Sequence, residues 1–477
     1  MRASRGAAGT RTRRAALALV VVGASGLAAF LYLRSADAQR LDPRRPGVFV
    51  VGAPGGASPT MRGDGRRTGA SKDVLPSGVL HVAWRKTIGL SIDQPALAGP
   101  DGTLAIVTAR GDVVFIDADG EEKGRATSGT TSIGPATVTS DGTVVFMSSA
   151  GDAVGVRRTS PRPRFVTRIG GERNQRAPPL SLDDGGVVVA TASDLVVLDA
   201  EGSVRSRVSL PESPSAALLA SGDKVIAVTA TGAVYGWTPG REPLRLGSFG
   251  APIDGGAALG DANTLLAVVE GNQLVELDLA RGARSSRSIA AQGLYLGPPS
   301  VRSVGAGGAA PDSGPLGALA TLLAQTSTRA FVVTIDPGGH ETLRAPIATL
   351  TPGTLPDGGP MPLVARPHTG PIVDPRGAVA FAAPDGHIGI VGAEGSVDSL
   401  GELICSQTPR SAGIAGLTPF GRGAFAVTCE GGVVAKITGG EPDSLRARPG
   451  AALKAPQRPA SGPSARPAGA SGAADDP

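Results

Sequence analysis

One acidic run in this sequence has a spacing that could bind a metal ion. Asp117-x-Asp119 is followed by Gly120, Glu121 and Glu122, and closely spaced carboxylates are the oxygen ligands that Ca²⁺ prefers. An EF-type loop needs Asp or Asn at its fifth position and Gly at its sixth, where Glu121 and Glu122 stand here. Similar Asp-Gly turns recur along the chain without the additional acids. We therefore interpret this run as a turn between two strands.

Other residue types with catalytic or metal-binding chemistry are scattered. His81, His340, His368 and His387 stand singly, whereas metal sites need ligands that are clustered or at fixed spacing. The sequence contains no Gly-x-x-x-x-Gly-Lys-[Ser/Thr] phosphate loop and no Gly-x-Ser-x-Gly nucleophile turn. We therefore predict no catalytic residue, no metal site and no cofactor.

The two cysteines form the remaining candidate site. We expect Cys405 at the end of a fourth strand and Cys429 at the end of a second strand of the next repeat. They could form a disulfide between neighbouring repeats, which requires Cα atoms within about 7 Å of each other. Two separate buried thiols are the alternative. The sequence alone leaves this choice open.

Eight repeats must position these residues. In each repeat, an apolar run leads to an Asp-Gly-type turn, a second apolar run, a tight turn and a third run that often ends in Asp. The turns between the second and third runs lie at Gly111, Gly151, Ser193, Gly232, Gly271, Thr328, Gly386 and Gly431. Five of the seven spacings are 39–45 residues, and the two longer ones contain insertions at 305–314 and 351–369. A period of about 40–45 residues with short apolar runs predicts the four-stranded blades of a β-propeller.

The last repeat, residues 411–439, contains only three apolar runs, and a spare strand at 79–89 precedes the first repeat. We predict that this strand completes the last blade and closes the ring. The expected fold is all-β, an eight-bladed β-propeller of four-stranded antiparallel blades over residues 77–439. Residues 34–76 are expected to be a linker and an arm laid over the propeller. Residues 440–477 have too few apolar side chains to fold, and we expect disorder there.

The N-terminal segment predicts export or anchoring. Residues 1–14 are Arg-rich, and residues 15–33 contain no charged side chain, which is long enough for one hydrophobic membrane-spanning helix. Ala36-Asp37-Ala38 supports the alternative, a signal peptide cleaved near Ala38. Because Arg-rich flanks stay in the cytoplasm, we expect an inner-membrane anchor with the propeller in the periplasm of a bacterial cell envelope, or secretion after cleavage.

The charge distribution argues against nucleic-acid binding. The formal net charge is +5, but residues 1–45 hold nine arginines and two acids. Without that segment, the 46 basic and 41 acidic side chains fall to 37 and 39. No basic stripe is left to follow a phosphate backbone, and aromatic residues for base stacking make up only 3% of the chain.

Two features together resemble the quinoprotein-type (PQQ-like) β-propeller family over about residues 60–439. The first is an Arg-Gly-Asp-x-x-x-Thr-Gly segment followed by a strand with Trp-Arg, and the second is a Gly-x-[Val/Leu]-x-x-[Leu/Ile]-Asp-x-x-Gly core, as in GDVVFIDADG (111–120). The residues that match the first feature are Arg62, Gly63, Asp64, Thr68, Gly69, Trp84 and Arg85. The resemblance implies a structural role for these seven residues.

Within this family, the chain is more similar to the non-enzymatic propeller subunit of the bacterial outer-membrane β-barrel assembly machinery than to the quinoprotein dehydrogenases. The dehydrogenase branch implies a Trp stacked on the quinone, adjacent cysteines, a bound Ca²⁺ and a catalytic Asp, whereas this chain has two Trp and no Cys-Cys pair. It also lacks the lipidation Cys of the assembly propeller, so membership in that complex does not follow.

We therefore expect a non-catalytic envelope protein that binds an unknown envelope partner through rim loops, with the two insertions as candidate loops. The first alternative is a quinoprotein-type dehydrogenase with a cofactor in the centre of the ring. The second is a surface carbohydrate-binding propeller, for which the 3% aromatic content offers few stacking platforms.

Overall fold

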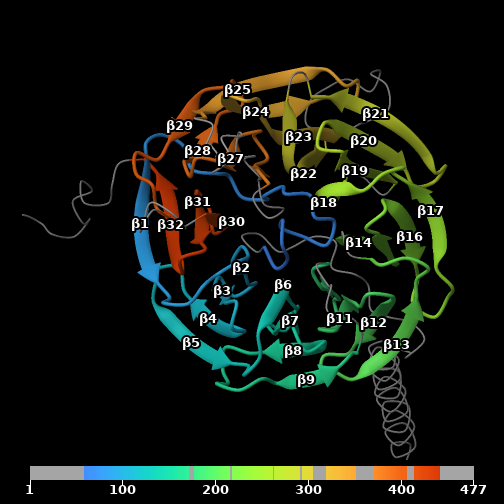
Figure 1. Ribbon diagram of the computed structural model, residues 1–477. Coiled ribbons are helices and arrows are strands. Elements are labelled where there is room, and N and C mark those ends of the chain that lie inside the picture. Colours follow the sequence, from blue (N-terminus) through green and yellow to red (C-terminus); the bar gives the residue numbers. More distant parts are fainter. Residues whose placement is uncertain are drawn as a thin grey trace, which may run out of the picture. The chain divides into compact units, whose positions relative to one another are not determined.

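A computed structural model describes residues 58–170, 177–214, 217–260, 263–290, 293–303, 318–350, 370–405 and 413–440. These residues form 32 strands in eight four-stranded antiparallel sheets, arranged as blades around a common centre (Figure 1). None of them forms a helix long and apolar enough to cross a membrane. The all-β, eight-bladed prediction is confirmed.

The first four blades follow the chain in order. Blade 1 contains β2 (Leu97–Ala98), β3 (Leu104–Val107), β4 (Asp112–Ile116) and β5 (Glu122–Thr127). Blade 2 contains β6 (Ser132–Val138), β7 (Val144–Ser148), β8 (Asp152–Val156) and β9 (Phe165–Arg168). Blade 3 contains β10 (Leu180–Ser181), β11 (Val187–Ala190), β12 (Asp194–Leu198) and β13 (Val204–Ser209). Blade 4 contains β14 (Ala217–Ser221), β15 (Lys224–Val228), β16 (Ala233–Trp237) and β17 (Leu244–Ser248).

The other four blades complete the ring. Blade 5 contains β18 (Ile253–Leu259), β19 (Thr264–Val269), β20 (Gln273–Asp278) and β21 (Ala283–Ile289). Blade 6 contains β22 (Leu294–Ser303), β23 (Ala318–Gln325), β24 (Arg329–Ile335) and β25 (Glu341–Thr349). Blade 7 contains β26 (Ile372–Val373), β27 (Val379–Ala382), β28 (Ile388–Val391) and β29 (Val397–Ser399). Blade 8 contains β30 (Ile414–Pro419), β31 (Ala424–Cys429), β32 (Val433–Gly439) and, from the N-terminal side, β1 (Leu80–Thr87).

Blade 8 joins the two ends of the ring. Its strand order is β1-β32-β31-β30, and β1 pairs antiparallel with β32 from Leu80 opposite Gly439 to Thr87 opposite Val433. The prediction that an upstream strand completes the last blade is therefore confirmed. In the other blades the first strand lies nearest the ring centre and the fourth lies at the rim (Figure 1).

Apolar side chains between neighbouring blades form the core. In β3, Leu104 and Ile106 pack toward blade 8, while Ala105 and Val107 pack toward blade 2. Successive side chains of a strand point to opposite faces, so a blade buried on both faces needs continuous rather than alternating apolar runs. This explains runs such as LAIV and VVFMS.

The Asp-Gly turns have the predicted side-chain chemistry. The Oδ1 atoms of Asp117, Asp199 and Asp278 each accept the backbone N–H two residues downstream, at distances of 2.8–3.0 Å. Gly120 and Gly202 then have φ angles of 86°, which L side chains rarely adopt. The interpretation of the Asp117 run as a strand turn is confirmed.

Several predictions concern residues outside the described ones. These are the hydrophobic segment 15–33, the cleavage site near Ala38, the insertions at 305–314 and 351–369, His368, and the tail beyond Gly440.

Candidate functional site

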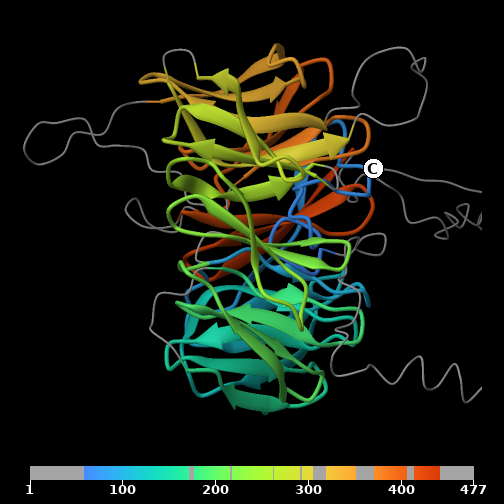
Figure 2. The same ribbon diagram turned by 90° about the vertical axis from the view of Figure 1, so that its right-hand side faces the viewer.

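Residues 58–75, which we call the arm, run around the ring centre on one face of the propeller. Figure 2 shows the blue arm at one side of the ring in an edge-on view. The arm contacts the blades in their order around the ring. The backbone N–H groups of Ala98, Val138, Ala220, Leu259, Val301, Val373 and Gly423 donate to the carbonyl oxygens of Ser58, Pro59, Gly65, Arg66, Thr68, Gly69 and Val74, respectively.

These contacts satisfy the innermost edge of the sheets. The first strand of a blade has a pairing partner on one side only, so its other edge presents unpaired N–H and C=O groups. The arm supplies one backbone acceptor to the first strand of each of blades 1, 2 and 4 to 7, and one to the β30–β31 turn of blade 8. It therefore acts as a shared inner partner of blades that are far apart in the sequence.

Arg67 supplies the contact to blade 3 and is 1% exposed. Its Nε donates to Leu218 O at 2.8 Å in blade 4. Its Nη2 donates to Pro178 O at 3.1 Å and Pro179 O at 3.0 Å, just before β10 of blade 3. Its Nη1 donates to Met61 O of the arm at 3.0 Å. All four bonds use carbonyl oxygens, so the guanidinium joins two blades without any side-chain acceptor.

Arg62 and Arg66 make comparable contacts with the next two blades. The Arg62 Nη1 donates to Pro298 O of blade 6 at 3.3 Å, and its Nη2 donates to Ser300 Oγ at 3.1 Å. The Arg66 Nη2 donates to Gly260 O, which follows β18 of blade 5, at 2.7 Å. Together the three arginines fasten the arm to blades 3, 4, 5 and 6.

Asp64 lies among these arginines. Its Oδ1 accepts the Arg66 N–H at 3.0 Å, and its carbonyl oxygen accepts the Thr60 hydroxyl at 2.9 Å. Burial raises the pKa of Asp64, and the Arg66 N–H and charge offset only part of this effect. Burial also lowers the pKa of Arg62 and Arg67, but guanidinium groups stay protonated at neutral pH. The ring centre is therefore cationic.

Gly63 and Gly69 shape the arm for these contacts, and the Thr68 Oγ1 accepts the Ala70 N–H at 3.2 Å. Gly63 has a φ of 97°, and Gly69 has a φ of 65°. A Cβ on Gly69 would lie 2.8 Å from the Arg62 Nη2 and would collide with the Ser300 side chain. Only glycine lets the backbone approach blade 6 this closely. The structure thus brings Arg62, Gly63, Asp64, Thr68 and Gly69 together at the ring centre.

Trp84 and Arg85 lie elsewhere, on β1 at the rim. The Trp84 Nε1 donates to Ala118 O of blade 1 at 2.9 Å, and the Trp84 ring covers Gly120, where a Cβ would come within 2.9 Å of it. The Arg85 Nη2 donates to Ile404 O at 2.9 Å. Because neighbouring residues on a strand point to opposite faces, β1 is fastened to blade 1 on one side and to the blade 7–8 connection on the other.

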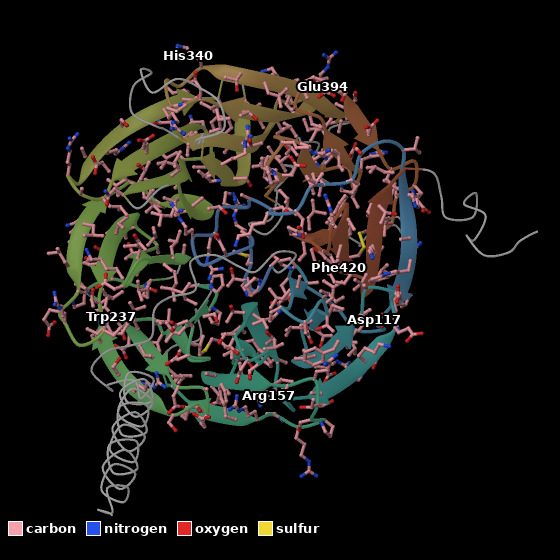
Figure 3. The ribbon with its side chains drawn as sticks, turned by 180° about the vertical axis from the view of Figure 1, so that it is seen from behind. Asp117, Arg157, Trp237, His340, Glu394 and Phe420 are labelled. Atoms are coloured by element: carbon pink, nitrogen blue, oxygen red, sulfur yellow. A yellow bond between two sulfur atoms is a disulfide. The ribbon has the colours of Figure 1, made fainter. Side chains whose placement is uncertain are left out.

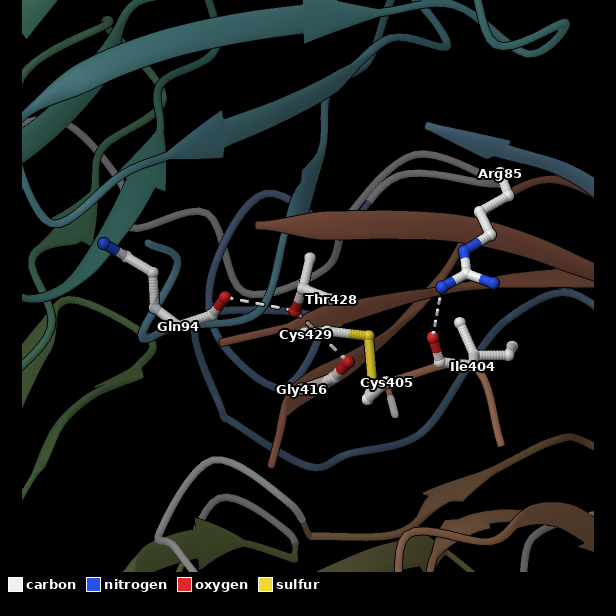
Figure 4. Close-up of a disulfide and its surroundings, with 7 residues drawn as sticks. All are labelled: Arg85, Gln94, Ile404, Cys405, Gly416, Thr428 and Cys429. Carbon is white, nitrogen blue, oxygen red and sulfur yellow. Dashed lines mark hydrogen bonds between the residues drawn. A yellow bond between two sulfur atoms is a disulfide. The ribbon is translucent and has the colours of Figure 1, made fainter. Parts of the chain in front are cut away.

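The structure joins Cys405 and Cys429 in a disulfide, with Cα atoms 5.3 Å apart (Figure 4). Cys429 ends β31, as expected. Cys405 was placed by the sequence at the end of a fourth strand, and this is wrong, because β29 ends at Ser399 and Cys405 lies in the turn region that follows. The disulfide therefore ties the blade 7–8 connection to blade 8, next to the carbonyl that accepts Arg85.

The Asp117 carboxylate in the acidic run already binds donors of the protein itself. Its Oδ1 accepts the N–H groups of Asp119 at 3.0 Å and Glu121 at 2.9 Å, and its Oδ2 pairs with the Lys123 Nζ at 2.9 Å. Among the described residues, no group of three or more His, Cys, Asp or Glu side chains could hold a metal ion.

A groove of about 360 Å³ opens on the arm face where blade 8 meets blade 1. We call it the seam groove. Figure 3, which views the ring from behind Figure 1, shows Phe420 at this position. The groove is lined by Asp73 of the arm, the turns at Gly99–Gly102 and Phe420–Arg422, Ala118, and Lys436 of β32.

The sequence reasoning missed this groove, although it carried one signal. Lys436 interrupts the otherwise apolar start of β32, VVAKITG, where a buried-blade strand should continue with apolar residues. A lysine at that position indicates a side chain that reaches an opening between blades. The sequence could not identify the residues that surround Lys436, because its hydrogen-bond partner Ala118 is 318 residues away.

Comparisons with known proteins identify the fold. No family model and no curated protein sequence matches this chain. The structure of BamB from Moraxella catarrhalis is similar at 16% identity, with a TM-score of 0.51, covering 76% of this chain and 98% of that one. Quinohemoprotein alcohol dehydrogenase from Comamonas testosteroni is similar at 10% identity, with a TM-score of 0.52 and 81% coverage of both chains. The related enzyme ADHIIG from Pseudomonas putida HK5 has the same identity and TM-score, with 80% coverage of both chains.

These identities show the fold alone. The neighbours include BamB and quinohemoprotein dehydrogenases, and the fold does not choose between them, because propellers host unrelated functions. This chain therefore shares the β-propeller fold with these neighbours.

Proposed function

We propose that this chain is a non-catalytic scaffold of the cell envelope that binds partner proteins on the surface of its propeller. The observation that carries the proposal is the filling of the ring centre by the arm. One pocket beside Arg62 and Gly69 has a volume of about 10 Å³, which is enough for one water molecule.

The arm is also an unsuitable lining for a cofactor site. One backbone donor of the first strand in each of blades 1, 2 and 4 to 7 is bonded to the arm backbone, and the Arg62 and Arg67 guanidiniums donate to backbone carbonyls. A quinone at this level would have to displace these bonds. The scaffold proposal needs no such rearrangement, because it uses only the outer surface.

The envelope location remains part of the proposal. It rests on the Arg-rich residues 1–14 and the uncharged residues 15–33. Fractionation of the native cells, followed by N-terminal sequencing, tests it. An intact N-terminus in the membrane fraction supports an anchor, and a soluble form beginning near residue 39 supports cleavage.

Two measurements test the scaffold itself. Purified full-length protein is mixed with pyrroloquinoline quinone and Ca²⁺, and its absorption spectrum and dye-linked alcohol dehydrogenase activity are recorded. We expect no bound quinone and no activity. A tagged chain is also crosslinked in its native host, and we expect one partner at a constant ratio to the chain. Quinone-dependent activity would overturn the proposal, and so would the failure to recover any partner at a constant ratio.

A further inference from the structure

The charged side chains that line the seam groove are Arg422, Lys436 and Asp73. Several arginines of other blades form ion pairs within their own blade, as with Arg205 and Asp184, Arg287 and Glu276, or Arg344 and Glu341. Neither Arg422 nor Lys436 pairs with a carboxylate of the described residues. Two cations that make no ion pair with a described carboxylate thus line one cavity, together with Asp73 of the arm.

Lys436 can be compared with Glu276, which lies at the corresponding position of another blade. Lys436 lies opposite Ala426, the third residue of β31, and Glu276 lies opposite Leu266, the third residue of β19. The two residues therefore hold corresponding positions in blades 8 and 5. Glu276 is neutralised by Arg287 at 3.2 Å, whereas the Lys436 Nζ is held by Ala118 O at 3.0 Å and lies 5.5 Å from the centre of the Phe420 ring.

These contacts fix the position of the Lys436 ammonium but leave part of its hydrogen-bonding capacity unused. An ammonium group has three donors, and one carbonyl leaves two of them available. Phe420 is 3% exposed, so its ring forms an apolar support beneath the charge and removes water from one side. Partial desolvation strengthens the attraction between a cation and an incoming carboxylate.

The other walls favour an extended peptide as the source of that carboxylate. The Gly99–Gly102 turn lines the groove with two glycines and Pro100, and a backbone can approach the glycines closely. Asp73 faces the same cavity from the arm, and a carboxylate there can accept a backbone N–H. The volume of about 360 Å³ is at the lower end of the range for ligand pockets and suits a few residues.

We propose that the seam groove is a docking site for an acidic, extended peptide segment of the partner protein, with a Glu or Asp side chain placed between Arg422 and Lys436. This inference rests on the proposed scaffold function. It adds the place on the ring and the chemistry that the partner must present.

Trp84 provides a direct reporter of binding. It is hydrogen-bonded to Ala118, a residue of the groove wall. The only other tryptophan, Trp237, is 1% exposed and lies in a different part of the ring (Figure 3). In the full-length chain, Trp237→Phe therefore leaves Trp84 as the sole indole. The probe is acetyl-tetraglutamate amide, and acetyl-tetraglutamine amide is the uncharged control.

We expect a saturable change in Trp84 fluorescence with the glutamate peptide, weakening as salt is added, and at least tenfold weaker or absent binding with the glutamine peptide. The double substitution Arg422→Glu with Lys436→Glu should raise the apparent Kd at least tenfold. The double substitution to Gln repeats the test without charge reversal. Arg329→Glu, at the start of β24, is the matched control and should leave the Kd unchanged. Calorimetric unfolding verifies that each variant is folded.

Three results would overturn the inference: no saturable binding of the glutamate peptide, equal binding of the glutamine peptide, or unchanged binding by both double variants. Binding to phosphatidylserine vesicles without peptide binding would also overturn it in favour of a membrane contact. In all of these cases, a crosslinked partner at constant ratio would still support the scaffold. Loss of that partner together with intact peptide binding would instead contradict the scaffold alone.

Discussion

At the residue scale, the arm depends on a few positions at which no other side chain fits. Gly69 combines a φ of 65° with close approach to Arg62 and Ser300. Gly129 has a similar φ of 75°, but a Cβ there would meet nothing within 4 Å. Alanine substitutions at the two glycines therefore distinguish two costs. At Gly129 only the backbone conformation is strained, whereas at Gly69 the added Cβ also collides with its neighbours.

We predict that Gly69→Ala lowers the free energy of unfolding by about 3 kcal/mol, because it adds overpacking to backbone strain. Gly129→Ala should lower it by about 1 kcal/mol, the cost of the backbone conformation alone. Urea unfolding of both variants measures the difference. Equal losses would show that the arm can move away from blade 6 without cost.

Asp64 makes the stability of the protein depend on pH in an unusual direction. Burial raises its pKa in the folded protein, so the folded protein binds a proton here more readily than the unfolded chain does. The charged form therefore costs stability above the raised folded pKa. This cost is relieved as the pH falls through that pKa, and it is gone below the unfolded value of about 3.9.

We predict that Asp64→Asn stabilises the protein relative to the wild type at pH 7.5, because the amide keeps an acceptor for the Arg66 N–H and removes the buried charge. The advantage should shrink as the pH falls toward 4. Urea unfolding of both proteins at several pH values gives this difference directly. A difference that grows toward acid pH would show that the charged carboxylate stabilises the arm.

At the element scale, β1 and the disulfide secure the same blade. β1 reaches blade 1 through Trp84 and the blade 7–8 connection through Arg85. Cys405 follows Ile404 in that connection and is bonded to Cys429 of β31. The N-terminal strand and the C-terminal blade are therefore held by both hydrogen bonds and a covalent link.

We predict that replacing Cys405 and Cys429 together with Ser lowers the free energy of unfolding by about 3 kcal/mol, the expected effect of releasing a loop closed over a separation of 24 residues. Reductant should lower the stability of the wild type by a similar amount and leave the variant unchanged. Thiol titration of unfolded, unreduced wild-type protein should detect no free thiol. Two titratable thiols would contradict the disulfide.

The elements were largely predictable from the sequence because their signals are local. The eight turns between second and third strands, the Asp-Gly turns and the closing role of β1 follow from residues that are neighbours in the sequence or from the count of strands. The contacts of Arg67 with Leu218, 151 residues away, were not predictable. Their acceptors are backbone carbonyls, which every residue carries, so no residue type marks them.

At the scale of the whole molecule, the arm gives the ring a second closure. Neighbouring blades hold each other through apolar side chains, so each seam is a local interaction. The arm instead bonds blades 1 and 2 and blades 4 to 8 through its backbone, and blade 3 through Arg67. Opening any one seam would therefore also disturb the arm, which couples the stability of distant blades.

Substituting Arg67 with Ala in the full-length chain tests this coupling. The substitution leaves buried carbonyl oxygens of blades 3 and 4 without donors, at a cost of at least about 3 kcal/mol. If the arm is one cooperative unit, the amides of Ala220, Leu259 and Val301, which all donate to the arm, should exchange with solvent about 100-fold faster. The amide of Ile226, inside blade 4 in β15, should keep its protection and serves as the internal control. If exchange became faster at Ala220 alone, each blade would hold its part of the arm independently.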